Sequence, residues 1–113
     1  MRTEFEKYMK IASELLSYCH LHGATKFYLD LKESDEDVVF NITALPVHID
    51  GKEMEILLKR LDAPRRREME QNYWKLGGRS EITSELLLIG MMVDEVSVVQ
   101  NDGSLTIKLM RQK

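Results

Sequence analysis

The sequence has few of the features that mark exported or membrane proteins. Among its 113 residues there is one cysteine, Cys19, and the longest apolar run, Leu86 to Val93, spans eight residues. A single thiol excludes an internal disulfide, and a bilayer-spanning helix needs roughly 20 apolar residues. The N-terminal residues lack the basic stretch followed by an apolar one that is typical of export signals. We therefore expect a cytoplasmic protein that does not enter a membrane.

Net charge is also nearly absent. The formal charge is -3 and the pI about 5.6, which argues against general attraction to nucleic acid or to anionic lipid. A basic cluster does occur at Lys59, Arg60 and residues 65–67, but Glu68 and Glu70 follow closely and offset it. We interpret the cluster as solvated surface, with a protein-facing patch as the next interpretation and nucleic-acid binding as the last.

What is present is the composition of one globular domain. Hydrophobic residues make up 43% of the chain and charged residues 31%, and only two prolines interrupt it. A chain of this length buries about two-thirds of the surface that its unfolded form exposes, which suffices for one core. We predict a single domain over residues 1–113.

The first half of the chain alternates between helical and strand patterns. Apolar residues spaced by three and four predict a helix over residues 3–22, with Gly23 at its C-terminal cap. Period-2 alternation then predicts two strands, around residues 26–32 and 38–43, which the polar turn between them joins into a hairpin. The helical stripe comprises Phe5, Tyr8, Met9, Ala12, Leu15, Leu16 and Cys19.

The second half continues with helices and closes with another hairpin. Asp50, followed three residues later by Glu53, is typical of a helix N-cap, and Met54, Leu57, Leu58 and Leu61 form the next apolar stripe. Further helices are predicted after Asp62-Ala63-Pro64 and over 85–92, and strands on either side of Asn101-Asp102-Gly103 form the second hairpin. The fold class is therefore α+β, a two-layer sandwich with about four strands in two hairpins, helices on one face, and the order α-β-β-α-α-α-β-β.

This order, together with two local patterns, resembles a known superfamily. The patterns are helix-His22-Gly23-Ala24-Thr25-strand, and residues 88–96 followed by a hairpin that ends in residues 106–109. They are similar to the ATPase domains shared by sensor histidine kinases, anti-sigma-factor kinases, gyrase and mismatch-repair proteins. The resemblance covers nearly the whole chain and implies a histidine-kinase-like ATPase fold.

The resemblance also implies where nucleotide would bind, and there the sequence departs from the family. The family's first helix carries Glu and, four residues on, a magnesium-binding Asn, and the matching residues are Glu14 and Tyr18. Where the family has Asp-x-Gly at the adenine, this chain has Ala44-Leu45-Pro46. The phosphate-binding Gly-x-Gly is missing around Thr83-Ser84-Glu85, and Glu85 adds a negative charge.

The degenerate cleft near Glu14, Tyr18, Ala44, Pro46 and Glu85 leads to three hypotheses. The first is a non-catalytic regulatory or protein-interaction module, serving in bacterial signalling as the resemblance implies, which has lost ATP binding and needs no cofactor. The second is a divergent ATPase or protein kinase that uses Glu14 as its base. The third is a small-ligand domain whose cleft is lined by Tyr18, Ala44, Pro46, His48 and Trp74.

Other clusters point to weaker hypotheses. Cys19, His20, His22 and His48 suggest a metal site, but their spacing matches no familiar zinc pattern and we expect none. Hydrolytic triads have no sequence support.

A protein partner or a second copy of the chain is the partner that we expect. The predicted helix Leu86 to Met92 is apolar nearly all round, and such a helix needs cover on every side. The outer face of the sheet, with Tyr28, Val39 and Met110, is the alternative interface.

Overall fold

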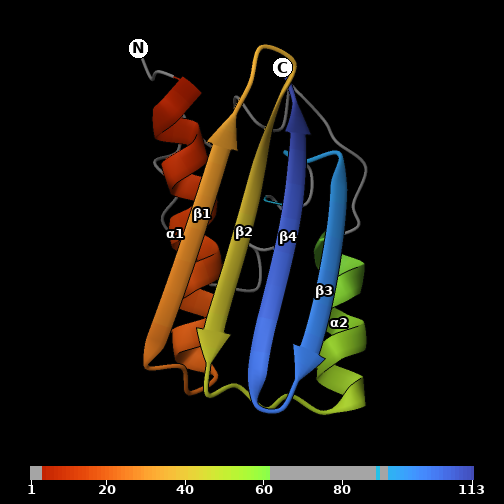
Figure 1. Ribbon diagram of the computed structural model, residues 1–113. Helices are drawn as coiled ribbons and strands as arrows, with labels where there is room; N and C mark the ends of the chain where they lie inside the picture. Colours follow the sequence, from red (N-terminus) through yellow and green to blue (C-terminus); the bar gives the residue numbers. More distant parts are fainter. Residues whose placement is uncertain (1–3, 62–88, 90–91) are drawn as a thin grey trace.

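The computed structural model describes residues 4–61, 89 and 92–113, and the described part is an α+β fold (Figure 1). The predicted order is found over this part as α-β-β-α-β-β. Two of the predicted helices, after residue 62 and over 85–92, fall largely outside the described residues; Ile89 and Met92 are described, and both are fully buried. The elements are α1 (Glu4–Leu21), β1 (Lys26–Glu33), β2 (Asp37–Leu45), α2 (Gly51–Leu61), β3 (Glu95–Asn101) and β4 (Ser104–Gln112).

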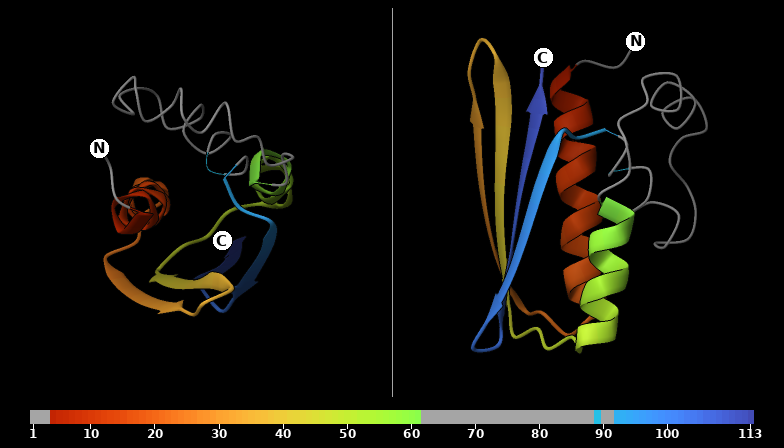
Figure 2. Two further views of the ribbon diagram at one scale, coloured as in Figure 1. Left: turned by 90° about the horizontal axis from the view of Figure 1, so that it is seen from above. Right: turned by 90° about the vertical axis from the view of Figure 1, so that its right-hand side faces the viewer.

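The four strands form one antiparallel sheet in the order β1-β2-β4-β3. Each predicted hairpin is confirmed, and the two hairpins join through β2 and β4. Both described helices lie on the same face of the sheet, α1 toward the β1 side and α2 toward the β3 side (Figure 2). The two-layer arrangement is therefore confirmed for the described elements, with β1 and β3 as the two edge strands.

The α1 helix ends as its sequence predicts. The N–H of Ala24 donates to the carbonyl of Cys19 and the N–H of Gly23 to that of His20, at 3.0 Å each. This pair of bonds is the Schellman motif, which needs a left-handed residue at the position that Gly23 occupies with φ of 103°. The helix thus stops at Leu21 and the chain turns directly into β1.

One stripe of α1 enters the core, and it is not quite the predicted one. Ile11 and Tyr18 are buried with Tyr8, Leu15 and their neighbours, although the predicted stripe includes neither. The prediction is also wrong for Phe5, whose side chain is 54% exposed. The difference arises because α1 packs chiefly on β2, which rotates the buried face away from the β1 side.

The α2 helix begins at the predicted cap. The N–H of Glu53 donates to Oδ1 of Asp50 at 2.8 Å, which satisfies one of the helix's first N–H groups. Leu57 and Leu61 are buried and Met54 packs against the core, but the assignment of Leu58 to the buried stripe is wrong, since it is 37% exposed. A helix on the rim of the sheet buries a narrower stripe than its apolar residues suggest.

The core lies between the helices and the two central strands. On the inner face of β2 and β4 every second side chain is fully buried, from Phe40 and Ile42 to Leu105 and Ile107. The same alternation places Arg111 inside, 4% exposed, where its Nη1 donates to the carbonyl of Met92 at 2.7 Å. The hairpin turn follows from Asp102 and Gly103, with φ of 49° and 79°, the left-handed pair that a type I′ turn requires.

Candidate functional site

Tyr18, predicted to stand where the family has a metal-binding Asn, lies between the two described helices. Its side chain is 3% exposed, and its hydroxyl donates to Oε2 of Glu53 in α2 at 2.6 Å. His22 packs beside it, with ring centroids 4.5 Å apart and Nε2 3.8 Å from the same Glu53 oxygen. Burial, reinforced by the neighbouring Glu53 carboxylate, raises the pKa of Tyr18 well above that of a free tyrosine. The tyrosine therefore acts as a neutral bridge between α1 and α2.

The other predicted cleft residues are divided between the core and the surface. Ala44 is fully buried in β2 and belongs to the same core cluster as Tyr18. Glu14 forms an ion pair with Lys10 at 2.9 Å, and Pro46 is exposed in the loop after β2. Glu85 and Trp74 lie outside the described residues. Of the predicted cleft residues, Tyr18 and Ala44 thus both belong to the core.

The predicted metal candidates do not converge. The Cys19 thiol is fully buried, and burial raises its pKa to about 11. His22 faces Glu53, whereas His48 lies over the turn at Gly103, where an added Cβ would come within 3.2 Å of the His48 ring. Within residues 4–61, 89 and 92–113, no three potential ligands are grouped around one point. Of the predicted basic cluster, Lys59 and Arg60 lie in the last turn of α2, and residues 65–67 fall outside the described part.

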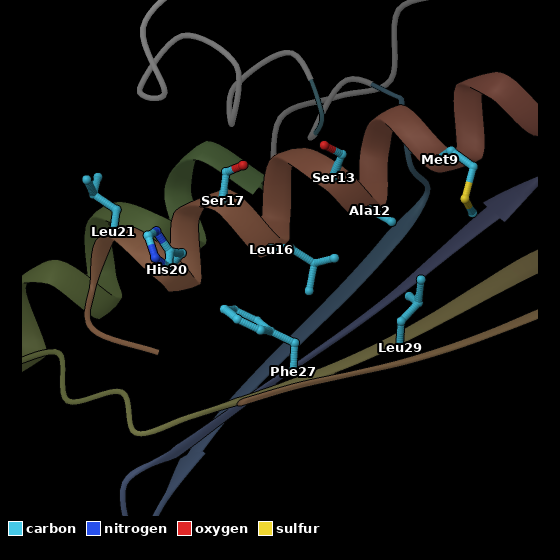
Figure 3. Close-up of a pocket in the computed structure, with 9 residues that line it drawn as sticks. All are labelled: Met9, Ala12, Ser13, Leu16, Ser17, His20, Leu21, Phe27 and Leu29. Carbon is cyan, nitrogen blue, oxygen red and sulfur yellow. The ribbon is translucent and has the colours of Figure 1, made fainter. Parts of the chain in front are cut away.

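The surface feature that sequence reasoning missed is a groove between α1 and β1. Its volume is about 770 Å³, and apolar side chains approach it from both elements (Figure 3). Leu16 and Phe27 point toward one another across it, and Met9 and Leu29 line it farther along. We call this feature the α1/β1 groove; it is lined by Met9, Ala12, Ser13, Leu16, Ser17, His20, Leu21, Phe27 and Leu29.

The groove exists because β1 is an edge strand. Phe27 and Leu29 stand opposite Ala44 and Ile42, so they share the helix-covered face of the sheet. Their partners on β2 are fully buried, but Phe27 and Leu29 are 39% and 42% exposed. The helix covers β2 and leaves the inner face of β1 partly open. The sequence did contain a signal for the groove, because α1 has two apolar columns, one that is buried and one that includes Met9 and Leu16.

The backbone of β1 is open on the same side. Among the described strands β1 pairs with β2 alone. The N–H of Ser34 donates to the carbonyl of Asp37. Because hydrogen-bonded pairs alternate along an antiparallel pair of strands, the even-numbered residues of β1 bond to β2. The N–H and C=O groups of Phe27, Leu29 and Leu31 therefore point away from β2. An unpaired strand edge of this kind is able to bind another extended segment.

The outer face of the sheet, the predicted alternative interface, has a more mixed surface. Tyr28 is 57% exposed, and Val39 and Met110 are partly buried directly opposite each other. Polar residues share this face, including Thr43 and Thr106, whose hydroxyls lie 3.2 Å apart. The α1/β1 groove is thus the more continuous apolar surface.

Comparisons with known proteins give no further assignment. No protein-family model matches the chain, and no curated protein sequence gives a significant match. Among the described residues, no helix has both the length and the apolar character needed to span a membrane.

Proposed function

We propose that this chain is a non-catalytic protein-interaction module, and that the α1/β1 groove with the edge of β1 is its binding surface. One observation carries the proposal. An apolar groove lies directly beside a strand edge whose backbone groups at Phe27, Leu29 and Leu31 have no partner within the described strands.

This combination suits recognition of an extended peptide segment. A strand added to an edge gains main-chain hydrogen bonds, and pockets for alternate side chains supply specificity. Here the added strand would bond to β1, and its inward side chains would contact Phe27, Leu29 and Leu16. An apolar groove rimmed by polar side chains, here Ser13 and Ser17, is a common form of interaction site.

We further propose that the fold is a histidine-kinase-like ATPase fold that has lost nucleotide binding, with no cofactor. Two contacts support the loss. Tyr18 is bound to Glu53 and buried, and Ala44 offers only a methyl group inside the core. The rival hypothesis, a divergent ATPase with Glu14 as base, needs a carboxylate that is ready to accept a proton. In this structure that carboxylate is held by Lys10.

Calorimetric titration with magnesium-ATP tests the second half of the proposal. We expect no binding heat up to millimolar nucleotide and no release of phosphate over hours. Binding in the micromolar range would refute the loss of nucleotide binding. Phosphate release that disappears in Glu14→Ala, with the circular dichroism spectrum unchanged, would establish the ATPase instead.

Selection of displayed peptides tests the first half. We expect the protein to select peptides with alternating apolar residues, and Leu29→Glu to lose them, because the new carboxylate faces the groove. Val99→Glu is the matched control, since Val99 is 55% exposed on the other edge strand, β3. Peptides that bind Leu29→Glu as well as the wild type would show that the groove is not the binding surface.

A further inference from the structure

The sequence of β1 restricts how it pairs with another strand. Its outer-face positions are Lys26, Tyr28, Asp30 and Lys32, and its inner-face positions are Phe27, Leu29 and Leu31. Along the outer face, Lys26 is positive, Tyr28 is neutral, Asp30 is negative and Lys32 is positive. A partner strand must therefore meet a defined series of charges on one side and an apolar row on the other.

A second copy of β1 satisfies both conditions in one register. A two-fold axis between antiparallel strands of one sheet stands perpendicular to that sheet, so both helix layers lie on the same side. Opposite residues then share a face, and the axis passes midway between one residue of β1 and the same residue of the second copy. The candidates that overlap most of the strand are axes at Tyr28, Leu29, Asp30 and Leu31.

Charge and polarity select among these axes. An axis at Leu29 places Lys26 opposite Lys32, and an axis at Asp30 places Asp30 opposite itself, so both juxtapose like charges. An axis at Leu31 pairs Asp30 with Lys32 but sets Glu33 opposite Leu29 on the apolar face. The axis at Tyr28 pairs Lys26 with Asp30 twice and Phe27 with Leu29 twice.

We infer that the chain forms a two-fold dimer in which β1 pairs antiparallel with β1 of a second copy, centred on Tyr28. The inference rests on the proposed function and names its partner. The outward N–H and C=O groups of Phe27 and Leu29 bond to those of Leu29 and Phe27 in the second copy. Two sheets become one continuous sheet, and the two α1/β1 grooves face each other across the axis.

The helix surface that meets at the axis fits this arrangement. Ser13 and Ser17 line the outer part of the groove, where they point away from the sheet, and both are small and exposed, so they leave room for a second α1. Met9 and Leu16 supply apolar contact beside them, and methionine adapts to irregular surfaces. In the dimer, the second copy would cover the apolar side chains of α1 that are exposed beside β1 in a single copy.

A cysteine placed on the axis tests the register directly. Tyr28 lies at a non-hydrogen-bonded pair, where Cα atoms are about 4.5 Å apart, within the range that a disulfide bridges. Tyr28→Cys should therefore form a covalent dimer on mild oxidation, seen on a non-reducing gel. Asp30→Cys is the matched control, because its two copies would be about 14 Å apart. A covalent dimer with Asp30→Cys, or none with Tyr28→Cys, would overturn the register.

Charge exchange tests the same contact without a covalent bond. Lys26→Asp and Asp30→Lys should each weaken dimerisation about tenfold, because each variant sets like charges opposite one another. Mixing the two variants should restore the wild-type affinity, because every cross-strand pair is again of opposite sign. Sedimentation velocity measures both effects. Failure of the mixture to recover would refute the Lys26 to Asp30 pairing.

The outcomes separate this inference from the proposed function. A monomer at every concentration, with peptide selection intact and lost in Leu29→Glu, would refute the dimer and leave the binding groove. A monomer that selects no peptide would refute both. Growth into open-ended oligomers would show that β1 pairs with β3 of the next copy, and that the two-fold dimer is wrong.

Discussion

The two edge strands of the sheet, β1 and β3, occupy equivalent places in the topology and differ in how they are held. The β3 strand is fixed at both ends by side chains. Near its start, Arg111 bonds to the carbonyl of Met92, and Oδ2 of Asp94 accepts from the N–H of Gln112 at 2.7 Å. Near its end, Gln100 bonds the backbone of Ile49. No described side chain is seen to fix β1 in this way, apart from the ion pair of Glu33 with Lys113 at 2.8 Å.

The inner faces of the two edges differ as well. On β3, Val96 and Val98 pack against the core cluster, and the next inner position is the polar Gln100. On β1, the inner positions stay apolar from Phe27 to Leu31, and two of them are over one-third exposed. One edge is closed by the chain itself, and the other presents apolar side chains beside open backbone groups. This difference is the reason for placing the proposed binding surface at β1.

Among the variants that target the edge strands and their anchors, breaking the anchor at the start of β3 should have the largest effect on stability. Arg111→Met keeps most of the side-chain volume but leaves the carbonyl of Met92 without its charged donor. We expect a loss of about 2 to 3 kcal/mol in the free energy of unfolding, measured by urea denaturation. Glu4→Gln is the control, since Glu4 is exposed and 3.5 Å from Arg111, and it should cost less than about 0.5 kcal/mol. Equal losses in the two variants would contradict the anchoring role of Arg111.

Breaking the anchor at the end of β3 should have the next effect. Gln100 Oε1 accepts from the N–H of Ile49 at 2.8 Å, and its Nε2 donates to the carbonyl of Ile49 at 3.0 Å. Gln100→Ala removes both bonds, so we expect a loss of about 1 to 2 kcal/mol. Gln100→Glu retains an acceptor for the N–H and should lose less than Gln100→Ala. The reverse order would show that the bond from the N–H of Ile49 contributes little.

The residue that starts α2 on the β3 side should contribute less. Asp50→Ala removes the cap bond to the N–H of Glu53, and loss of an N-cap costs about 1 kcal/mol. Asp50→Asn should recover most of the loss, because the amide oxygen caps equally well. Thermal unfolding is measured for the three proteins, and an unchanged midpoint in Asp50→Ala would rule out the cap's contribution.

The smallest effect on stability should come from the open edge. Leu29→Ala removes a side chain that already contacts solvent, so we expect less than about 1 kcal/mol, against about 2 to 5 kcal/mol for Leu105→Ala in the closed core. Urea denaturation of both variants gives the two losses. Self-association should fall nonetheless in Leu29→Ala, because Leu29 faces Phe27 of the second copy. A loss at Leu29 equal to that at Leu105 would show that the groove is already filled in the monomer.

Local chemistry explains what could be predicted from the sequence. The two hairpins follow from period-2 alternation and from turn residues such as Asp102-Gly103, which tolerate the positive φ angles that a two-residue turn requires. The start of α2 at Asp50 and the end of α1 at Gly23 follow from caps that satisfy neighbouring backbone groups. Each of these features depends on residues a few positions apart.

The groove and the buried arginine depend on long-range arrangement, and for that reason they could not be predicted. The alternation predicts that the side chains of Phe27 and Ile42 both point toward the core. Only the strand order shows that Phe27 is on an edge strand and Ile42 on a central strand. The orientation of α1 about its own axis likewise follows from its packing on β2. This orientation exposes Phe5 and buries Tyr18. Arg111 occupies the next inward position of β4 after Leu109. The period of two alone predicts that it is buried, but a charged residue is not expected in a core.

The strand order also has a consequence for the pathway of folding. Each hairpin joins neighbours in sequence, but the central pair, β2 with β4, brings together residues such as Val39 and Met110 that are separated by more than half the chain. Contacts of high sequence separation form slowly, because a long loop must close before they contribute. The two hairpins would therefore form first, and the pairing of β2 with β4 would be the slow step, formed in the rate-limiting transition state.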